Sequence, residues 1–483
     1  MLLFRRKLLG SHCSQLSLRG LATCAIRTVG LPATLSTTMG LTVSTNMGVP
    51  DVHDARDLPR EVLALQATSP ATFAVTALDG HRFAWVKPAG PAGPEQLIVA
   101  DPATLQSWMK DEWKIGSVTG WPDTIGQLLG PEAMANTRSA EQHQRLRQLF
   151  SPMLRDDSMA RMLPKIQGSV QRYMREWAAK GTVPAYTETL TLVFDVLVNQ
   201  AMQLDWPDAD IKKYAVLFEV WNQGFTPSTA DPRWAKGMEA RKELVARFRS
   251  AVSDPRLPPG SIPATLRDEY GAESDVVTDN LIMVLFAGFE TSTSLTVRLL
   301  YELAKHPDAL QKLRAEQQAV AAKHVPTLGL KALGAMTYTE AAISEALRLG
   351  QMVANVPRVA TKAIETPRAP PVPAGCPFSA SWAGQSVLDP AVQGSTTAFN
   401  PDRWLDKRNK ASLKLHQTPF GYGTHSCLGW RIARAVAAAV AQELALAYEL
   451  SAETDAAWDD FPTGSRPANE LPLSLKPLAA SAQ

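Results

Sequence analysis

One cysteine, Cys427, lies among glycines in the stretch PFGYGTHSCLGWRIA, directly before an alanine-rich segment. A cysteine in this setting can be a small core residue, a zinc ligand, a nucleophile or a haem ligand. A nucleophilic cysteine needs a base, and His425 stands two residues away. Neither a disulfide framework nor a C-x-x-C zinc site is predicted, because the other three cysteines are scattered along the chain: Cys13, Cys24 and Cys376.

A second segment, residues 277–306, combines a strongly apolar stretch with polar residues. Leu281–Phe286 is apolar on all faces, which indicates a buried helix. Gly288, Glu290 and Thr291 follow directly. A glycine costs a helix roughly 1 kcal/mol relative to alanine, and a buried carboxylate is expensive unless it is paired. Two interpretations stay open: a packing glycine beside a partly exposed acid, or a flat object lying against Gly288 with an acid and a hydroxyl beside it.

Length and composition limit the classes of protein to which the chain can belong. It has 483 residues, of which 45% are hydrophobic and 20% charged, as in a globular protein with a large core. The formal net charge is +2, so the composition does not predict a nucleic-acid-binding protein. No Gly/Ser linker, low-complexity block or clear repeat follows Asp51. We therefore expect one domain over residues 51–480.

The first fifty residues differ from the rest. No Asp or Glu precedes Asp51, whereas five basic residues stand among many Ser and Thr: Arg5, Arg6, Lys7, Arg19 and Arg27. This composition is typical of an organelle transit peptide, although a disordered tail shares it. Residues 28–50 are too polar for a membrane span, so no transmembrane helix is predicted, and peripheral membrane association stays open. We expect residues 1–50 to be a transit peptide to a plastid, with a mitochondrion as the alternative.

Hydrophobic periodicity predicts a mainly α fold with a minor β portion. Residues 70–100 alternate apolar and polar positions around Asp79-Gly80, which predicts a hairpin of short strands. Residues 352–400 are Pro-rich and β-like, and an Ala-rich helix is predicted after Cys427. Four further segments have the periodicity of helices: 139–154, 162–181, 277–306 and 337–350.

Four motifs stand in one order along the chain. They are Ala287–Ser292 (A-G-F-E-T-S), Glu345 and Arg348 (E-x-x-R), Phe399–Trp404 with Arg403, and F-x-x-G-x-x-x-C-x-G formed by Phe420, Gly423, Cys427 and Gly429. On these residues, the sequence resembles the cytochrome P-450 superfamily of haem-thiolate monooxygenases over about residues 60–480. The resemblance implies the cytochrome P-450 fold, with haem b (iron protoporphyrin IX) between the long central helix and the helix after the Cys loop.

A closer branch is also suggested. The segments GWPDTIGQLLG, AKGMEAR and HQRLRQLF look like those of the retinoid-hydroxylating members and the related plant sterol and abscisic-acid hydroxylating members. The chain departs from the family at Gln351-Met352, where a Pro-Pro pair is usual. These positions border the substrate pocket in the family, so the departure puts the substrate in doubt but not the haem site.

The resemblance implies that Cys427 is the axial ligand of the haem iron. A thiolate ligand pushes electron density onto iron and favours O–O cleavage. Gly423 and Gly429 would let the backbone bend so that N–H groups point at the sulfur, and Phe420 would shield it. The positive N-terminal end of the following helix would also lower the thiol pKa. The haem propionates need cations, and the implied candidates are His143, Arg147, Arg358 and His425.

Two further sets of residues receive roles from the resemblance. Thr291 would hydrogen-bond bound oxygen or an ordered water, and Glu290 would relay protons from solvent. Glu345, Arg348 and Arg403 would form a structural ion cluster, in which guanidinium groups satisfy a buried carboxylate.

Three functions compete. The leading one is a monooxygenase that hydroxylates an apolar, isoprenoid substrate (carotenoid-, retinoid-, sterol- or terpenoid-like) with O2. The alternatives are a haem-thiolate hydroperoxide lyase or isomerase and a non-catalytic haem-binding protein, and the Glu290–Thr291 pair argues against both. The chain has no flavin or Fe–S motif, so two electrons would come from a separate protein, a ferredoxin or a flavoprotein reductase. Four basic residues are either its docking site or a solvated charge run: Lys407, Arg408, Lys410 and Lys414.

Overall fold

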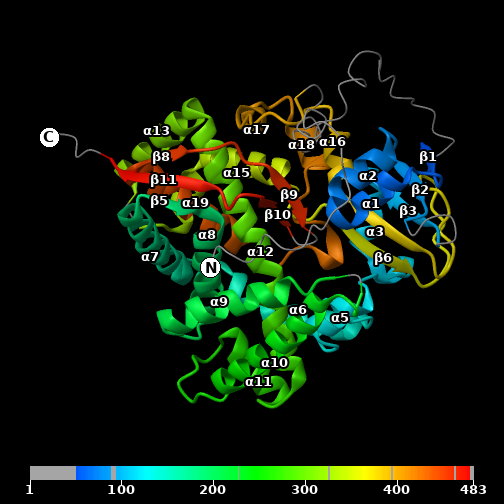
Figure 1. The fold of residues 1–483 in the computed structure, drawn as a ribbon, viewed down its shortest axis with the longest axis horizontal. Helices are drawn as coiled ribbons and strands as arrows, with labels where there is room; N and C mark the ends of the chain where they lie inside the picture. Colours follow the sequence, from blue (N-terminus) through cyan, green and yellow to red (C-terminus); the bar gives the residue numbers. More distant parts are fainter. Residues whose placement is uncertain are drawn as a thin grey trace, which may run out of the picture. The chain divides into compact units, whose positions relative to one another are not determined.

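The long apolar segment forms helix α12 (Asp275–Lys305), which runs through the helical part of the protein (Figure 1). The Ser274 hydroxyl caps its N-terminus by accepting a hydrogen bond from the Val276 backbone N–H. Pro307 opens the next helix and ends this one. Among the described residues, α12 is the one helix long and apolar enough to cross a membrane, yet 72% of that stretch is buried inside the protein.

The computed structural model describes residues 51–88, 94–226, 228–324, 327–392, 395–461 and 464–478. All of these residues belong to one compact unit. The expected transit peptide, residues 1–50, lies outside the described residues.

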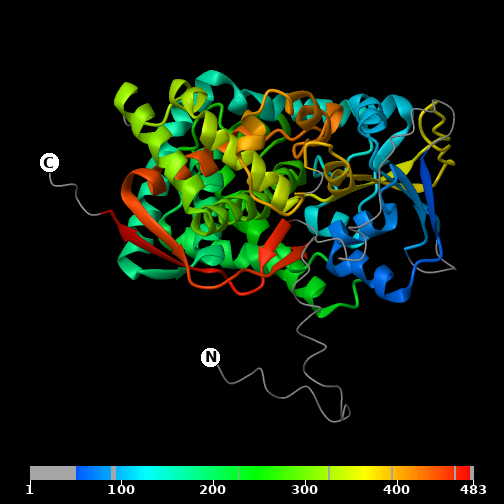
Figure 2. The ribbon, with the colours of Figure 1, turned by 90° about the horizontal axis from the view of Figure 1, so that it is seen from above.

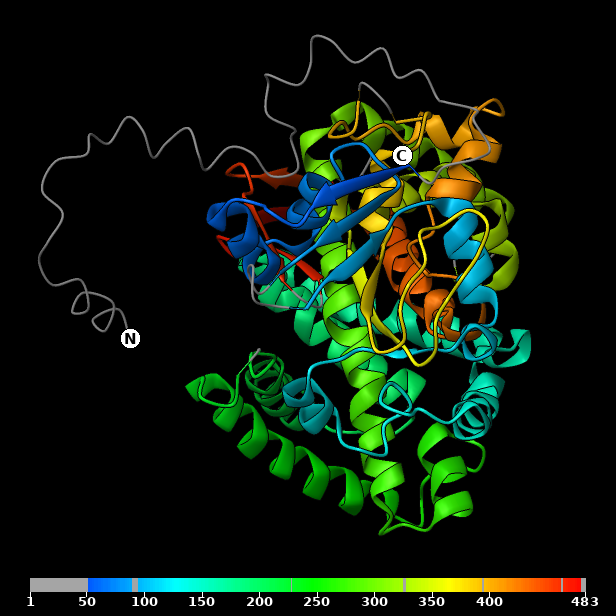
Figure 3. The same cartoon turned by 90° about the vertical axis from the view of Figure 1, so that its right-hand side faces the viewer.

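Four elements that pack against α12 position the site. They are α8 (Ala185–Asp195), the π-helical turn η3 (Val196–Ala201), α15 (Thr337–Gly350) and α19 (Trp430–Ala447). The predicted Ala-rich helix is α19, and its small buried side chains let it lie alongside α12 (Figure 3). The central helix and the helix after the Cys loop are therefore neighbours, as the resemblance implies.

The remaining helices complete the mainly α fold, which confirms the predicted class. They are α1 (Arg60–Thr68), α2 (Pro70–Leu78), α3 (Pro102–Lys110), α4 (Glu112–Ile115), α5 (Asp123–Leu129), α6 (Ala140–Phe150), η2 (Ser151–Leu154), α7 (Asp156–Lys180), α9 (Asp208–Asn222), α10 (Pro232–Val252), α11 (Ile262–Tyr270), α13 (Pro307–Lys323), α14 (Leu330–Ala335), α16 (Trp382–Val387), α17 (Asp402–Leu405), α18 (Lys410–His416) and η4 (Gly423–His425).

The strands form three sheets in the described part of the chain. The largest has the order β1-β2-β3-β7-β6-β4 and lies to one side of the helices (Figure 2). Its strands come from both ends of the chain: β1 (Val52–Ala55), β2 (Phe83–Val86), β3 (Gln96–Val99), β4 (Ser117–Thr119), β6 (Asn355–Ala360) and β7 (Pro377–Ser381). The two smaller sheets are β5-β11-β8 and β10-β9, formed by β5 (Thr182–Pro184), β8 (Tyr448–Ala452), β9 (Trp458–Phe461), β10 (Gly464–Pro467) and β11 (Pro472–Pro477).

The predicted hairpin over residues 70–100 is wrong in its first half. Residues 70–78 form helix α2, because the buried positions Ala71, Ala74 and Ala77 recur every three residues on one face. Asp79 adopts a left-handed φ of 45° and ends this helix instead of joining two strands. The true hairpin consists of β2 and β3, which pair antiparallel.

The end of α15 explains why the chain lacks the usual Pro-Pro pair. Gln351 follows the helix with a φ of +44°, and its side-chain amide donates a hydrogen bond to the Arg348 carbonyl. Proline is locked near a φ of about −65°. Position 351 therefore cannot hold proline in this backbone.

Candidate functional site

The Cys loop is shaped by glycine. Gly421 and Gly423 have φ values of +67° and +57°, and the Cys427 backbone N–H donates to the Phe420 carbonyl at 2.8 Å. A Cβ at Gly423 would lie 2.0 Å from the Met109 carbonyl oxygen. Position 423 therefore needs glycine for both its backbone conformation and its contact with α3.

The Cys427 side chain faces open space although it lies within the protein. The side chain is accessible from this space, yet the protein atoms that surround the thiol desolvate it and raise its pKa. The backbone N–H groups of Gly429 and Trp430 point at the sulfur and act in the opposite direction on this pKa, as does the Arg147 guanidinium. A Cβ at Gly429 would meet no protein atom within 4 Å. The structure thus places two backbone N–H groups at the sulfur, directly at the start of α19.

Helix α12 has an opening on one face of its middle turns. Ala287 is exposed and Thr291, one turn later, is partly exposed, although Phe289 and Glu290 between them are buried. The Thr291 hydroxyl donates a hydrogen bond to the Ala287 carbonyl at 2.7 Å, so its oxygen remains available as an acceptor. An exposed alanine inside a core helix indicates an interior space, and α12 packs along the helix that follows Cys427. A flat cofactor between these two elements fits both observations.

The role predicted for Gly288 is corrected. A Cβ on this glycine would lie 2.9 Å from Leu197 Cδ2, so the residue faces η3. The glycine is needed for the close packing of α12 on η3, and Ala287 takes the place that we expected Gly288 to have at the open face.

The position predicted for Glu290 is also corrected. The residue is 1% exposed and therefore does not line the open face with Thr291. Its carboxylate accepts hydrogen bonds from Tyr186 of α8, Asn222 of α9 and Arg466 of β10. Burial raises the pKa of Glu290 despite the nearby Arg466 guanidinium. This geometry is that of a buried ion cluster.

The four predicted propionate partners gather beside the Cys loop. The rings of His143 and His425 have centroids 4.2 Å apart, and Arg147 Nη1 donates to the Ser426 carbonyl at 2.9 Å. Arg358 joins this group from strand β6. The fifth member is Glu112 of α4, which no motif indicates. It accepts two hydrogen bonds from Arg358 and lies 3.0 Å from His425 Nδ1.

This set fits an acidic group. His143 is 2% exposed, and its Nδ1 has no hydrogen-bond partner among the described residues. Burial and the nearby charges of His425 and Arg147 lower the pKa of His143 to about 3. A buried nitrogen without a partner beside several cations is what a carboxylate ligand would satisfy. The two guanidinium groups and two imidazole rings predicted to bind the propionates therefore lie together at one place.

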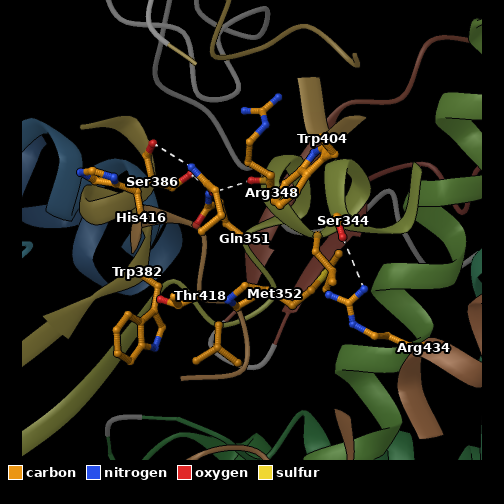
Figure 4. Close-up of a pocket in the computed structure, with 14 residues that line it drawn as sticks. Ser344, Arg348, Gln351, Met352, Trp382, Ser386, Trp404, His416, Thr418 and Arg434 are labelled. Atoms are coloured by element: carbon orange, nitrogen blue, oxygen red, sulfur yellow. Dashed lines mark hydrogen bonds between the residues drawn. The ribbon is translucent and has the colours of Figure 1, made fainter. Parts of the chain in front are cut away.

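A cavity lined by both polar and apolar residues lies beside the start of the Cys loop (Figure 4). Its volume is about 50 Å³, enough for a few water molecules. The guanidinium of Arg434 lies 5.2 Å from the centre of the Phe420 ring, donates to Ser344 and pairs with Glu340. Burial lowers the pKa of Arg434 to about 10. The cavity is lined in part by Arg348, Gln351, Trp382, His416, Thr418 and Arg434.

The predicted structural ion cluster is present. Glu345 is fully buried and accepts hydrogen bonds from Arg348 at 2.8 and 2.9 Å and from Arg403 at 2.9 Å. Trp404 Nε1 and the Asn400 backbone N–H also donate to this carboxylate. The cluster joins α15 to α17 and to the segment directly before it. The motif analysis found its three charged members but not the role of Trp404.

The remaining predicted residues lie as follows. Phe420 is partly buried at the Cys loop, and the basic residues considered for partner docking are exposed on or beside α18: Lys407, Arg408, Lys410 and Lys414. Arg408 pairs with Asp406. Within the described residues no group of three or more His, Cys, Asp or Glu side chains could hold a metal ion.

Comparisons with known proteins bear on the fold and the family of the chain. The family model "Cytochrome P450" matches residues 264–469. Cytochrome P450 26B1 of Danio rerio is 27% identical over 363 residues, 69% of each chain. Ent-kaurenoic acid oxidase 2 of Arabidopsis thaliana is 26% identical over 392 residues, 77% of this chain and 78% of its own. The solved structure "Retinoic acid bound cyanobacterial CYP120A1" has a TM-score of 0.75 at 22% identity, covering 89% of this chain and 100% of its own.

The fold and the family-model match define a haem-thiolate protein, a class that binds haem b through a cysteine thiolate. The chain belongs to the cytochrome P450 family. It is a P450 monooxygenase, an oxidoreductase that incorporates oxygen from O2.

Proposed function

We propose that the protein hydroxylates an apolar isoprenoid substrate of retinoid or terpenoid type. The observation that carries this proposal is the apolar region over the open face of α12. Phe286 stacks on Phe225 with ring centroids 4.8 Å apart and an interplanar angle of 5°, next to the exposed Ala287. The names of the relatives, which refer to retinoic acid and kaurenoic acid, support the same substrate class.

Hydrogen bonds hold the covering segments of this region together. Thr124 of α5 donates to the Thr226 carbonyl at 2.7 Å, and Trp234 of α10 donates to the Thr124 carbonyl at 3.3 Å. Trp221 of α9 donates to the Leu128 carbonyl at 3.2 Å. Segments from three parts of the chain thus form one aromatic-rich cover, which suits a ligand with few polar groups.

The residues around the cofactor site have three tasks: they bind the cofactor, shield its thiolate ligand from water and supply protons. Bound haem supplies O2 binding and O–O cleavage, which an axial thiolate favours. The N–H groups of Gly429 and Trp430 stabilise the thiolate of Cys427. The Phe420 ring of the same loop packs against the Arg434 guanidinium. Thr291 offers its hydroxyl oxygen at the open face and can hold an ordered water that supplies protons.

Spectroscopy tests this proposal directly. The reduced protein should show the red-shifted CO band of a thiolate-bound haem, and its absence from haem-loaded protein would exclude Cys427 as the ligand. Retinoids, carotenoids, sterols, terpenoids and fatty acids are then added separately while the Soret spin-state shift is followed. An isoprenoid should give the largest shift, and a preference for fatty acids would contradict the substrate class.

Two further proposals follow from the sequence. Electrons come from a separate ferredoxin or flavoprotein reductase, because the chain has no flavin or Fe–S motif. Lys407, Lys410 and Lys414 supply exposed positive charge for docking an acidic partner. Residues 1–50 direct the chain to a plastid, and import of a reporter fused to them into isolated plastids or mitochondria decides the destination.

A further inference from the structure

Glu290 is held by donors from three separate elements. Its Oε1 accepts hydrogen bonds from Tyr186 Oη at 2.6 Å and Arg466 Nε at 2.9 Å. Its Oε2 accepts from Asn222 Nδ2 at 3.1 Å and Arg466 Nη2 at 2.9 Å. A carboxylate offers about four acceptor positions, so those of Glu290 are occupied. The carboxylate cannot turn toward Thr291 without losing charge-assisted bonds.

Arg466 connects this carboxylate to a second one. Its Nη1 donates to Glu219 Oε1 of α9 at 2.8 Å, while Nε and Nη2 bind Glu290. The guanidinium also lies 5.5 Å from the centre of the Tyr186 ring. Arg466 belongs to β10, which pairs with β9 and contacts α12. One cation therefore joins the β9–β10 hairpin to α9 and to the turn of α12 that carries Thr291.

We propose that Arg466 is a positioning residue for oxygen activation: by holding Glu290 it fixes the turn of α12 that carries Thr291 and couples that turn to the β9–β10 hairpin. This inference rests on the proposed function, the hydroxylation of an isoprenoid substrate. Glu290 then acts through its ion pair with Arg466 and not as a proton donor. Loss of either partner releases the same turn, since no other described cation binds Glu290.

The first test is hydrogen exchange of the substrate-free ferric holoprotein. Arg466→Gln should accelerate amide exchange in residues 284–292 and 464–467 together, by roughly tenfold or more. Glu219→Gln is the matched control, because it removes the other carboxylate on Arg466 and leaves Glu290 paired. Exchange in residues 284–292 that is unchanged in Arg466→Gln would overturn the coupling.

The second test separates positioning from proton donation. With all-trans-retinoic acid as the probe, the fraction of electrons released as H2O2 and the solvent isotope effect on turnover are measured. Arg466→Gln, Glu290→Gln and the double variant should raise H2O2 release to a similar extent without changing the isotope effect, and Arg466→Lys should restore part of the coupling. A larger isotope effect in Glu290→Gln alone would identify a proton donor and overturn the proposal.

Failure of the Arg466 proposal can be distinguished from failure of the proposed function. If all-trans-retinoic acid produces no Soret shift in the wild-type protein, the substrate class fails, while the exchange measurement still decides whether Arg466 holds the α12 turn. If the CO band is absent, the haem-thiolate function fails whatever the exchange result.

Discussion

The carboxylate of Glu112 accepts hydrogen bonds from Arg358 Nε at 2.8 Å and Nη2 at 3.2 Å, and both residues are buried. Burial alone would raise the pKa of Glu112, but His425 and Arg358 outweigh it and lower this pKa. Glu112 therefore holds together Arg358 of β6 and His425 of the Cys loop. The propionate site depends on an acid as well as on its basic residues.

Glu112→Gln should reduce both stability and haem retention. The substitution leaves Arg358 buried without its counter-ion, and breaking a buried pair costs about 3–5 kcal/mol. Denaturant unfolding and the rate of haem transfer to apomyoglobin measure the two effects. Glu269→Gln removes an exposed partner of Arg145 and serves as the control. Equal haem transfer rates in the two variants would contradict the positioning role of Glu112.

His143 should make the haem-free protein less stable in acid. Its folded-state pKa of about 3 lies below the ordinary value of 6.5, so the unfolded chain binds a proton first as pH falls. The free energy of unfolding should be steady above pH 6.5 and fall toward pH 3 by about 1.4 kcal/mol per pH unit. His143→Asn should flatten this part of the curve, whereas His81→Asn, on a partly exposed residue, should not.

Glu345→Ala should yield no haem-loaded protein. The substitution leaves Arg348 and Arg403 buried without their shared carboxylate, which costs about 3–5 kcal/mol for each broken pair. A haemochromogen assay per mole of purified protein measures the loss, and Glu269→Ala is the surface control. Normal haem content in Glu345→Ala would refute the structural role.

Cys427→Ser should abolish the red-shifted CO band, whereas Cys376→Ser should keep it. Only the first substitution removes the sulfur that faces open space beside the Gly429 and Trp430 N–H groups. The reduced CO spectra of the two variants at equal haem content give the answer. Retention of the band in Cys427→Ser would require another thiolate.

Gly423→Ala should be far more damaging than Gly375→Ala. Both glycines have positive φ, which costs a residue with a Cβ about 1–2 kcal/mol. At Gly375 a Cβ meets nothing within 4 Å, but at Gly423 it lies 2.0 Å from the Met109 carbonyl oxygen. The difference in unfolding free energy between the variants measures this contact. An equal loss of unfolding free energy in the two variants would contradict this, because it would mean that α3 can move away from the added Cβ without destabilising the protein.

The sequence predicts the parts of this protein that repeat a local pattern. Helices α12 and α15 follow from their apolar periodicity, and Cys427, Glu345 and Arg348 follow from motifs. Helix α2 was mistaken for a strand because a short alanine-rich segment satisfies both periods.

The partners that lie far apart in the chain could not be predicted. Glu112 and Arg466 are single charged residues in unremarkable segments, and only the fold brings them to Arg358 and Glu290. Glu290 belongs to the Ala287–Ser292 motif, but a motif does not indicate in which direction a side chain points. Gly288 was placed on the wrong face of α12 for the same reason.

The 176 positions between Glu290 and Arg466 also affect the order in which the protein folds during synthesis. Glu290 is made long before its counter-ion, and a carboxylate buried without one is costly. The central helix therefore cannot reach its final packing while the ribosome still holds the last strands. A nascent chain stalled before residue 466 should therefore remain sensitive to protease around α12.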